Sequence, residues 1–174
     1  MYTQQEQQEI YRAVYEYAAD QLLWRVLYLD CVASDTPGTG EIREKLLTLP
    51  STLALILRSV CHSEDLEQLI ACIDKGNRIY VEYVDNVFQN GGCPESLRKM
   101  WDKNTAATAQ ALARVDPEWD EAAWTSMMLH QNDLLEQTCS GVKAGSYTTL
   151  VEVLPFIRRL ATDMSEYLAN GLCR

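Results

Sequence analysis

Short breaks divide this chain into long segments whose apolar residues recur every three or four positions. Three of these breaks, at residues 91–94 (GGCP), 116–120 (DPEWD) and 145–146 (GS), span only a few residues each. No segment between the breaks alternates apolar and polar residues as a half-buried strand would. Helices joined by connections this short pack antiparallel to one another. The sequence therefore predicts an all-α protein, an up-and-down antiparallel helical bundle.

Four or five long helices are expected to form the core of this bundle. Residues 41–62 differ, because Pro50 interrupts them and proline is tolerated best in the first turn of a helix. We expect two short helices there, packed as a crossover on one side or end of the bundle. Pro155 is expected to kink or fray the last helix. The long segments with helical periodicity are 4–33, 63–90, 94–115, 120–142 and 146–170.

Length and charge narrow the classes of function. A chain of 174 residues corresponds to about one domain, so residues 1–174 are expected to form a single helical-bundle domain. The net charge of −10 disfavours nucleic acids and anionic membrane surfaces, which both attract clusters of Lys and Arg. The longest apolar run, Leu53 to Leu57, is much shorter than the ~18 residues of a membrane span. We expect neither a nucleic-acid partner nor a membrane partner.

Six cysteines are spread along the chain without any Cys-x-x-Cys pair. The segment from Met1 to Glu9 is polar and rich in glutamine, whereas a secretory signal needs an apolar core. Proteins that stay in the cytoplasm keep their thiols reduced. We therefore expect a cytoplasmic protein with free cysteines, which are Cys31, Cys61, Cys72, Cys93, Cys139 and Cys173.

Motifs of common enzymes and metal centres are missing from the sequence. It contains no glycine-rich phosphate loop, no Gly-x-Ser-x-Gly elbow and no Glu-x-x-His pair of the kind that holds a di-iron site. Cys61-His62 precedes two acidic residues, and His130 lies three positions before Asp133. A metal patch and an acid–base pair are the alternatives here, but surface histidines explain both patterns better. We expect no catalytic residue, no cofactor and no bound metal.

Four amide side chains occupy positions on otherwise apolar helical faces. They are Gln21, Asn77, Asn104 and Gln131, and each belongs to a different predicted helix. In an antiparallel bundle these side chains can meet at one level, where each buried amide needs a hydrogen-bond partner. One interpretation is a structural layer that fixes helix pairing. The other is a ligand pocket in the core, whose border would also include the aromatic residues Trp24, Tyr80, Trp101 and Trp124.

Three stretches of the chain carry specific motifs. They are residues 45–58 (KLLTLPSTLALILR), residues 115–124 (VDPEWDEAAW) followed by Met-Met-Leu at 127–129, and Trp101 with Asn104. In these motifs the chain resembles an uncharacterised family of small bacterial helical-bundle proteins, and the resemblance covers most of the sequence. Some members of that family carry the label acetylglutamate kinase. The label does not suit this chain, because an amino-acid kinase needs an α/β sheet and glycine-rich phosphate loops.

The most specific part of the resemblance is the spacing of one proline and two tryptophans within residues 117–124. In the family, histidines lie on the first, third and penultimate helices. Alignment by the flanking residues puts those positions at Gln21, near Asn77 and at Gln131. A metal site of the family would be lost here, because carboxamides are poor replacements for imidazole. The resemblance also implies that the three amides share one site.

These patterns favour a non-enzymatic function. The leading prediction is a helical binding or assembly module that forms a homo-oligomer, because long helices with wide aromatic and methionine-rich faces leave an apolar strip for a partner. The alternative is a bundle that binds a small molecule or a metal at a polar site in its core. An open cavity bordered by the four amides would favour the alternative, whereas a filled centre would favour the leading prediction.

Overall fold

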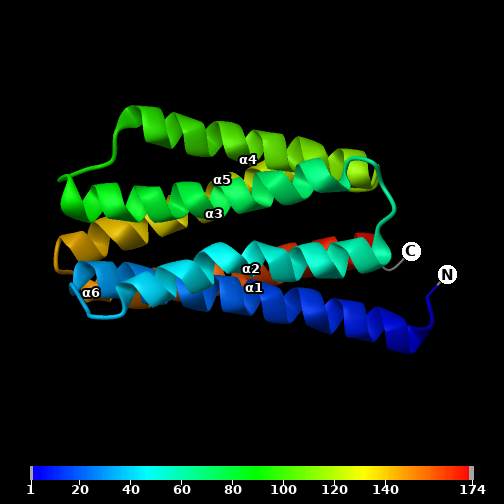
Figure 1. Cartoon of the computed structure of the whole chain (residues 1–174), viewed down its shortest axis with the longest axis horizontal. Helices are drawn as coiled ribbons and strands as arrows, with labels where there is room; N and C mark the ends of the chain where they lie inside the picture. Colours follow the sequence, from blue (N-terminus) through cyan, green and yellow to red (C-terminus); the bar gives the residue numbers. More distant parts are fainter. Residues whose placement is uncertain (1, 173–174) are drawn as a thin grey trace.

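Six helices make up the described part of the molecule, residues 2–172, which contains no strand (Figure 1). This computed structural model confirms the predicted all-α class. Even the shortest helix has 21 residues. The helices are α1 Gln4–Ala33, α2 Thr39–Val60, α3 Leu66–Gln89, α4 Glu95–Val115, α5 Glu121–Lys143 and α6 Tyr147–Leu172.

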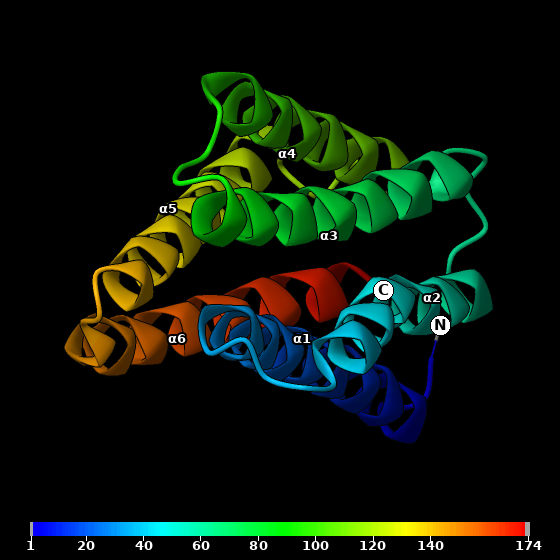
Figure 2. The ribbon, with the colours of Figure 1, turned by 60° about the vertical axis from the view of Figure 1, so that its left-hand side comes forward.

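The helices form a closed ring of antiparallel neighbours. Each helix packs against the next one in the chain, and α6 returns to pack along α1. Further contacts join α1, α3 and α5 across the centre of the ring. Figure 2 shows α1, α2 and α6 in one half of the bundle and α3, α4 and α5 in the other. The predicted helical bundle is therefore confirmed, with six long helices in place of four or five.

A single helix, α2, replaces the two short crossover helices that we expected in residues 41–62. It runs without a break from Thr39 to Val60, with Pro50 buried in its interior. Pro50 lacks the N–H that would bond to the carbonyl of Leu46, four residues earlier. The side chain of Asn77 on α3 donates to that carbonyl instead, at 3.0 Å between Nδ2 and the oxygen. The expectation was wrong because a distant side chain satisfies the group that the proline leaves unpaired.

The second internal proline, Pro155, also lies within a continuous helix. It is an exposed residue of α6, and so is Val151, whose carbonyl loses its helical partner. Water can reach a carbonyl on an exposed face. For this reason α6 needs no side chain to replace the lost hydrogen bond, whereas the buried proline of α2 does.

Apolar side chains gather into two cores, which occupy opposite halves of every helix. On α1, Ile10 and Val14 belong to the smaller core, whereas Tyr28 and Leu29 belong to the larger one. The antiparallel arrangement brings matching halves of the six helices together. The larger core includes Leu46, Tyr80, Val84, Trp101 and Leu135, and the smaller core includes Leu57, Leu69, Leu112, Trp119 and Trp124.

A belt of buried polar side chains lies between the two cores, midway along the bundle. We call this set the polar belt. Its members come from α3, α4, α5 and α6, so the belt crosses most of the ring. Because each buried polar group needs a hydrogen-bond partner, the belt restricts which helices can face one another. Its members are Asn77, Asn104, Thr105, Thr108, Asn132 and Ser165.

The five cysteines within the described residues are free thiols, and Cys173 lies outside that range. Burial raises the pKa of Cys61 to about 11. Burial likewise raises the pKa of Cys139 to about 12. Both thiols therefore stay protonated and weakly nucleophilic at neutral pH.

None of the helices described combines the length and the apolar character of a membrane span.

The close approach of α5 to α6 depends on Gly141. A Cβ atom added there would lie 2.5 Å from the Cβ of Thr149, too close for two carbon atoms. We expect Gly141→Ala to lower the free energy of unfolding by about 1–3 kcal/mol, because the helices must separate to relieve the overlap. Urea denaturation followed by circular dichroism measures the change.

Gly40 in the first turn of α2 provides the matched control. No described atom lies within 4 Å of the position that its Cβ would take. Gly40→Ala should leave the stability unchanged or raise it by up to about 1 kcal/mol, because alanine restricts the unfolded chain. Equal effects of the two substitutions would contradict the packing argument for Gly141.

Candidate functional site

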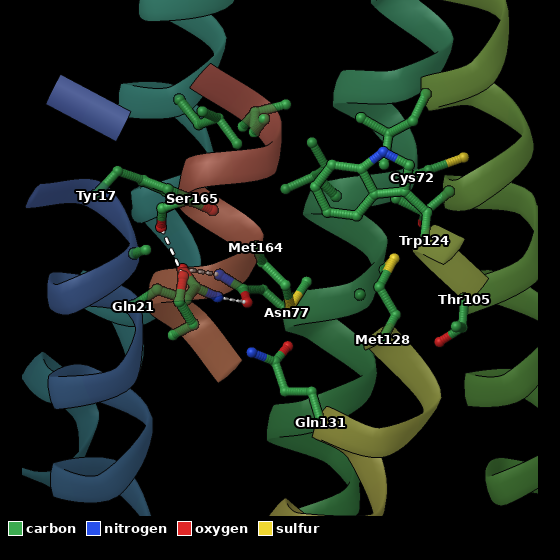
Figure 3. A pocket seen from close by; sticks show the side chains of 18 of the residues that line it. Tyr17, Gln21, Cys72, Asn77, Thr105, Trp124, Met128, Gln131, Met164 and Ser165 are labelled. Atoms are coloured by element: carbon green, nitrogen blue, oxygen red, sulfur yellow. Dashed lines mark hydrogen bonds between the residues drawn. The ribbon is translucent and has the colours of Figure 1, made fainter. Parts of the chain in front are cut away.

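A cavity of about 170 Å³ lies where the polar belt separates the two cores (Figure 3). Side chains from all six helices line it. Two of the helices, α1 and α3, supply the polar residues Gln21 and Asn77, which reach toward each other in Figure 3. The indole of Trp124 and the side chains of Met128 and Met164 form an apolar part of the wall. The cavity thus has a polar region and an apolar region.

Most of the residues that sequence analysis predicted for a pocket line this cavity. Two do not. Trp24 is half-buried on the larger core, with the Nζ of Lys45 at 5.8 Å from its ring centre. Tyr80 is buried in the larger core, where its hydroxyl donates to the backbone carbonyl of Arg25 at 3.0 Å. The predicted residues that line the cavity are Gln21, Asn77, Trp101, Asn104, Trp124 and Gln131.

Arg25 is the main residue of the site that sequence analysis missed. Its Nη2 donates to Asn77 Oδ1 at 3.1 Å, and its Nη1 lies 3.4 Å from Gln131 Oε1. The guanidinium carbon also lies 5.2 Å from the ring centre of Tyr80, in cation–π geometry. Arg25 follows Gln21 by one helical turn, so both residues face the same side of α1. The arginine therefore joins the amides of α3 and α5 into one network.

The carboxamide of Gln21 completes this network on α1. In one orientation it exchanges hydrogen bonds with the carboxamide of Asn77. In the other, its oxygen lies 3.2 Å from Arg25 Nε and 3.1 Å from Arg25 Nη2, and its nitrogen lies 3.3 Å from the hydroxyl of Tyr17. A guanidinium has only donors, so the second orientation suits the arginine better.

Asn104 borders the same cavity but does not join the arginine network. Its Nδ2 donates to the backbone carbonyl of Cys72 on α3 at 3.0 Å. Gly76 leaves room for this contact, because a Cβ there would lie 3.3 Å from the same nitrogen. Nearby, Asn132 Nδ2 donates to Thr105 Oγ1 at 2.9 Å. The four predicted amides therefore surround one cavity. Gln21, Asn77 and Gln131 contact Arg25, whereas Asn104 links α4 to α3.

The site carries a single positive charge and no negative one. Among the described residues that line the cavity, Arg25 is the one charged side chain. No carboxylate of residues 2–172 lies within 4.0 Å of its guanidinium. Burial lowers the pKa of Arg25, but an arginine still keeps its proton at neutral pH. Burial raises the pKa of Tyr17 to about 12, so this phenol stays neutral.

Two hydrogen-bond donors of the cavity wall have no partner within the described chain. The buried Nε1 of Trp124 is one of them. The Nε2 of Gln131 is the other, because the only hydrogen bond of this side chain is the one its oxygen accepts from Arg25. Trp124 Nε1 is fully buried, whereas the side chain of Gln131 is half-buried, and buried polar groups are nearly always paired in folded proteins. These two donors are therefore free to serve an acceptor inside the cavity.

The two histidines lie away from this site. His62 and His130 are both exposed. Asp133, which the sequence offered as a partner for His130, instead pairs with Arg98 on α4 at 2.9 Å. Within residues 2–172, no three side chains of the metal-binding types gather closely enough to hold an ion.

No protein-family model, curated protein or solved structure matches the chain. The resemblance to the family of small bacterial helical-bundle proteins therefore stays a prediction.

The structure predicts that Asn77 and Pro50 are energetically coupled. Asn77→Ala should destabilise the protein by about 1–3 kcal/mol, because the Leu46 carbonyl is left buried without a donor. Pro50→Ala restores a backbone N–H that can bond to the same carbonyl. In the Pro50→Ala background we therefore expect the cost of Asn77→Ala to fall by about 1 kcal/mol.

A double-mutant cycle in urea measures this coupling. An identical cost of Asn77→Ala in both backgrounds would show that the hydrogen bond to Leu46 contributes nothing to stability.

Proposed function

We propose that this chain is a non-enzymatic binding protein that holds one small organic molecule between its two cores. The cavity of about 170 Å³ bordered by the predicted amides carries this proposal. A buried apolar cavity of about 150 Å³ is large enough to bind benzene. The space is therefore suited to a ligand built around one ring or a short chain.

The arrangement of polar groups supports a ligand site over a purely structural layer. A structural layer would use every donor within the protein and would fill the centre of the bundle. Here the Gln131 and Trp124 donors stay unpaired within the described chain, beside an open space. Apolar walls with a few convergent polar groups are also the usual composition of small-molecule sites.

Filling the cavity tests the proposal. Thr108 is a buried cavity residue whose hydroxyl donates to its own helix, at 2.8 Å from the Asn104 carbonyl. Thr108→Met should place a flexible apolar chain in the cavity and weaken the binding of benzene at least about tenfold, with little loss of stability. Ligand-observed NMR and thermal unfolding with and without benzene measure the two effects.

Thr138 is the matched control for this experiment. It is equally buried, and its hydroxyl donates to Leu134 of the same helix at 2.9 Å, but it does not line the cavity. Thr138→Met should keep benzene binding and lose stability by about 1–3 kcal/mol through overpacking. If the wild-type protein binds neither benzene nor its polar derivatives benzamide and benzoate, or if both variants bind benzene equally well, the proposal is wrong.

We also propose that the outer face of α1 and α6 pairs with a second copy of the chain. A surface groove of about 300 Å³ runs between these helices, and Tyr15, Leu23 and Val26 line it. Leu23 is 52% exposed beside this groove, so the groove and the side chain together present an apolar surface to a partner. The predicted homo-oligomer would cover this face.

A charge placed in the groove tests that pairing. Leu23→Glu should shift a dimer to a monomer in sedimentation velocity runs at micromolar concentration, because a buried unpaired carboxylate opposes association. Leu55→Glu is the control, since Leu55 is 69% exposed on α2 and does not line the groove. A monomeric wild-type protein would overturn the oligomer.

A further inference from the structure

We infer that the ligand of the central cavity is a small organic monocarboxylate whose carboxylate group pairs with Arg25. The inference rests on the proposed binding function and adds the chemical class of the ligand. It follows from three features of the cavity: the charge of its wall, the donors left free around that charge, and its size.

The charge of the wall favours an anion. Arg25 brings one positive charge into the centre of the bundle, and its hydrogen-bond partners there are the neutral amides of Gln21, Asn77 and Gln131. No Asp or Glu of the described residues lines the cavity. A buried cation without a counter-ion is costly, so an anion that enters the cavity gains a charge-assisted hydrogen bond and removes that cost.

The donors around Arg25 suit a carboxylate. A guanidinium has five N–H groups, and the amide oxygens of the site accept only some of them. The unpaired Nε2 of Gln131 adds a neutral donor next to the arginine, since its own oxygen is the atom that Arg25 contacts. A carboxylate accepts several N–H bonds at once, so it can take the second N–H of Arg25 Nη1 together with an N–H of Gln131 Nε2.

Charge balance and size select a monocarboxylate over a phosphate ester. One guanidinium neutralises a single negative charge, whereas a phosphate monoester carries about −1.5 to −2 at pH 7. Trp124, Met128 and Met164 offer the rest of the ligand an apolar surface. A cavity of about 170 Å³ leaves space for a body close to the size of benzene.

Benzoate and benzamide form the matched pair of probes, because they have nearly the same shape and differ in charge. Isothermal titration calorimetry at pH 7 on the full chain should give at least about tenfold tighter binding of benzoate than of benzamide. Arg25→Gln should remove this preference, and Arg25→Lys should keep part of it. Benzamide binding to Arg25→Gln shows that the cavity of that variant is still formed.

An exposed arginine of the same helix provides the control. Arg12 is exposed on α1 and pairs with Glu16, so Arg12→Gln makes the same change in net charge outside the cavity. It should leave the benzoate preference within about twofold of the wild type, because screened surface charges act weakly on a buried site.

The outcomes separate the two proposals. Benzamide binding as tight as that of benzoate, or a benzoate preference that survives Arg25→Gln, overturns the carboxylate assignment and leaves the binding function standing. Failure of benzene, benzamide and benzoate alike to bind the wild-type protein overturns both. Loss of the preference in Arg12→Gln would assign benzoate to the protein surface and also overturn the inference.

Discussion

The hydrogen bond from Asn77 to the Leu46 carbonyl supports both the shape of this bundle and its site. It allows α2 to continue through Pro50, so that a full-length helix fills its place in the ring between α1 and α3. The same side chain accepts a hydrogen bond from Arg25. Helix continuity and the position of the buried cation therefore depend on one carboxamide, whose oxygen and nitrogen serve different helices.

Much of the fold could be predicted because its signals are local. Glycine, proline and capping residues mark the breaks, and apolar periodicity marks five of the six helices. Residues 41–62 were misread because a proline inside a helix is normally excluded by its missing N–H. That exclusion fails when another part of the chain supplies a donor, and Asn77 lies 31 positions from Leu46. No local pattern reports such a pairing.

The candidate site was predictable only in part, because some of its residues stand out within their own helix and others depend on contacts with distant helices. Gln21, Asn77 and Gln131 stand out because amides are rare on apolar helical faces, and antiparallel packing brings them to one level. Arg25 follows Gln21 by one helical turn on α1, so the two residues share a face. A helical face that carries both a charged and a polar residue is ordinarily assigned to solvent. Its burial depends on acceptors from α3 and α5. The cavity exists because the side chains do not fill the centre of the bundle, and residue types alone do not predict where such a gap will be.

The contact between α6 and α1, which closes the ring, has a consequence for the order in which the molecule folds. Ile157, Met164 and Leu168 of α6 complete the cavity wall. The cavity therefore cannot form before α6 packs along α1. Until then, the apolar flank of α1 and the guanidinium of Arg25 stay open to water.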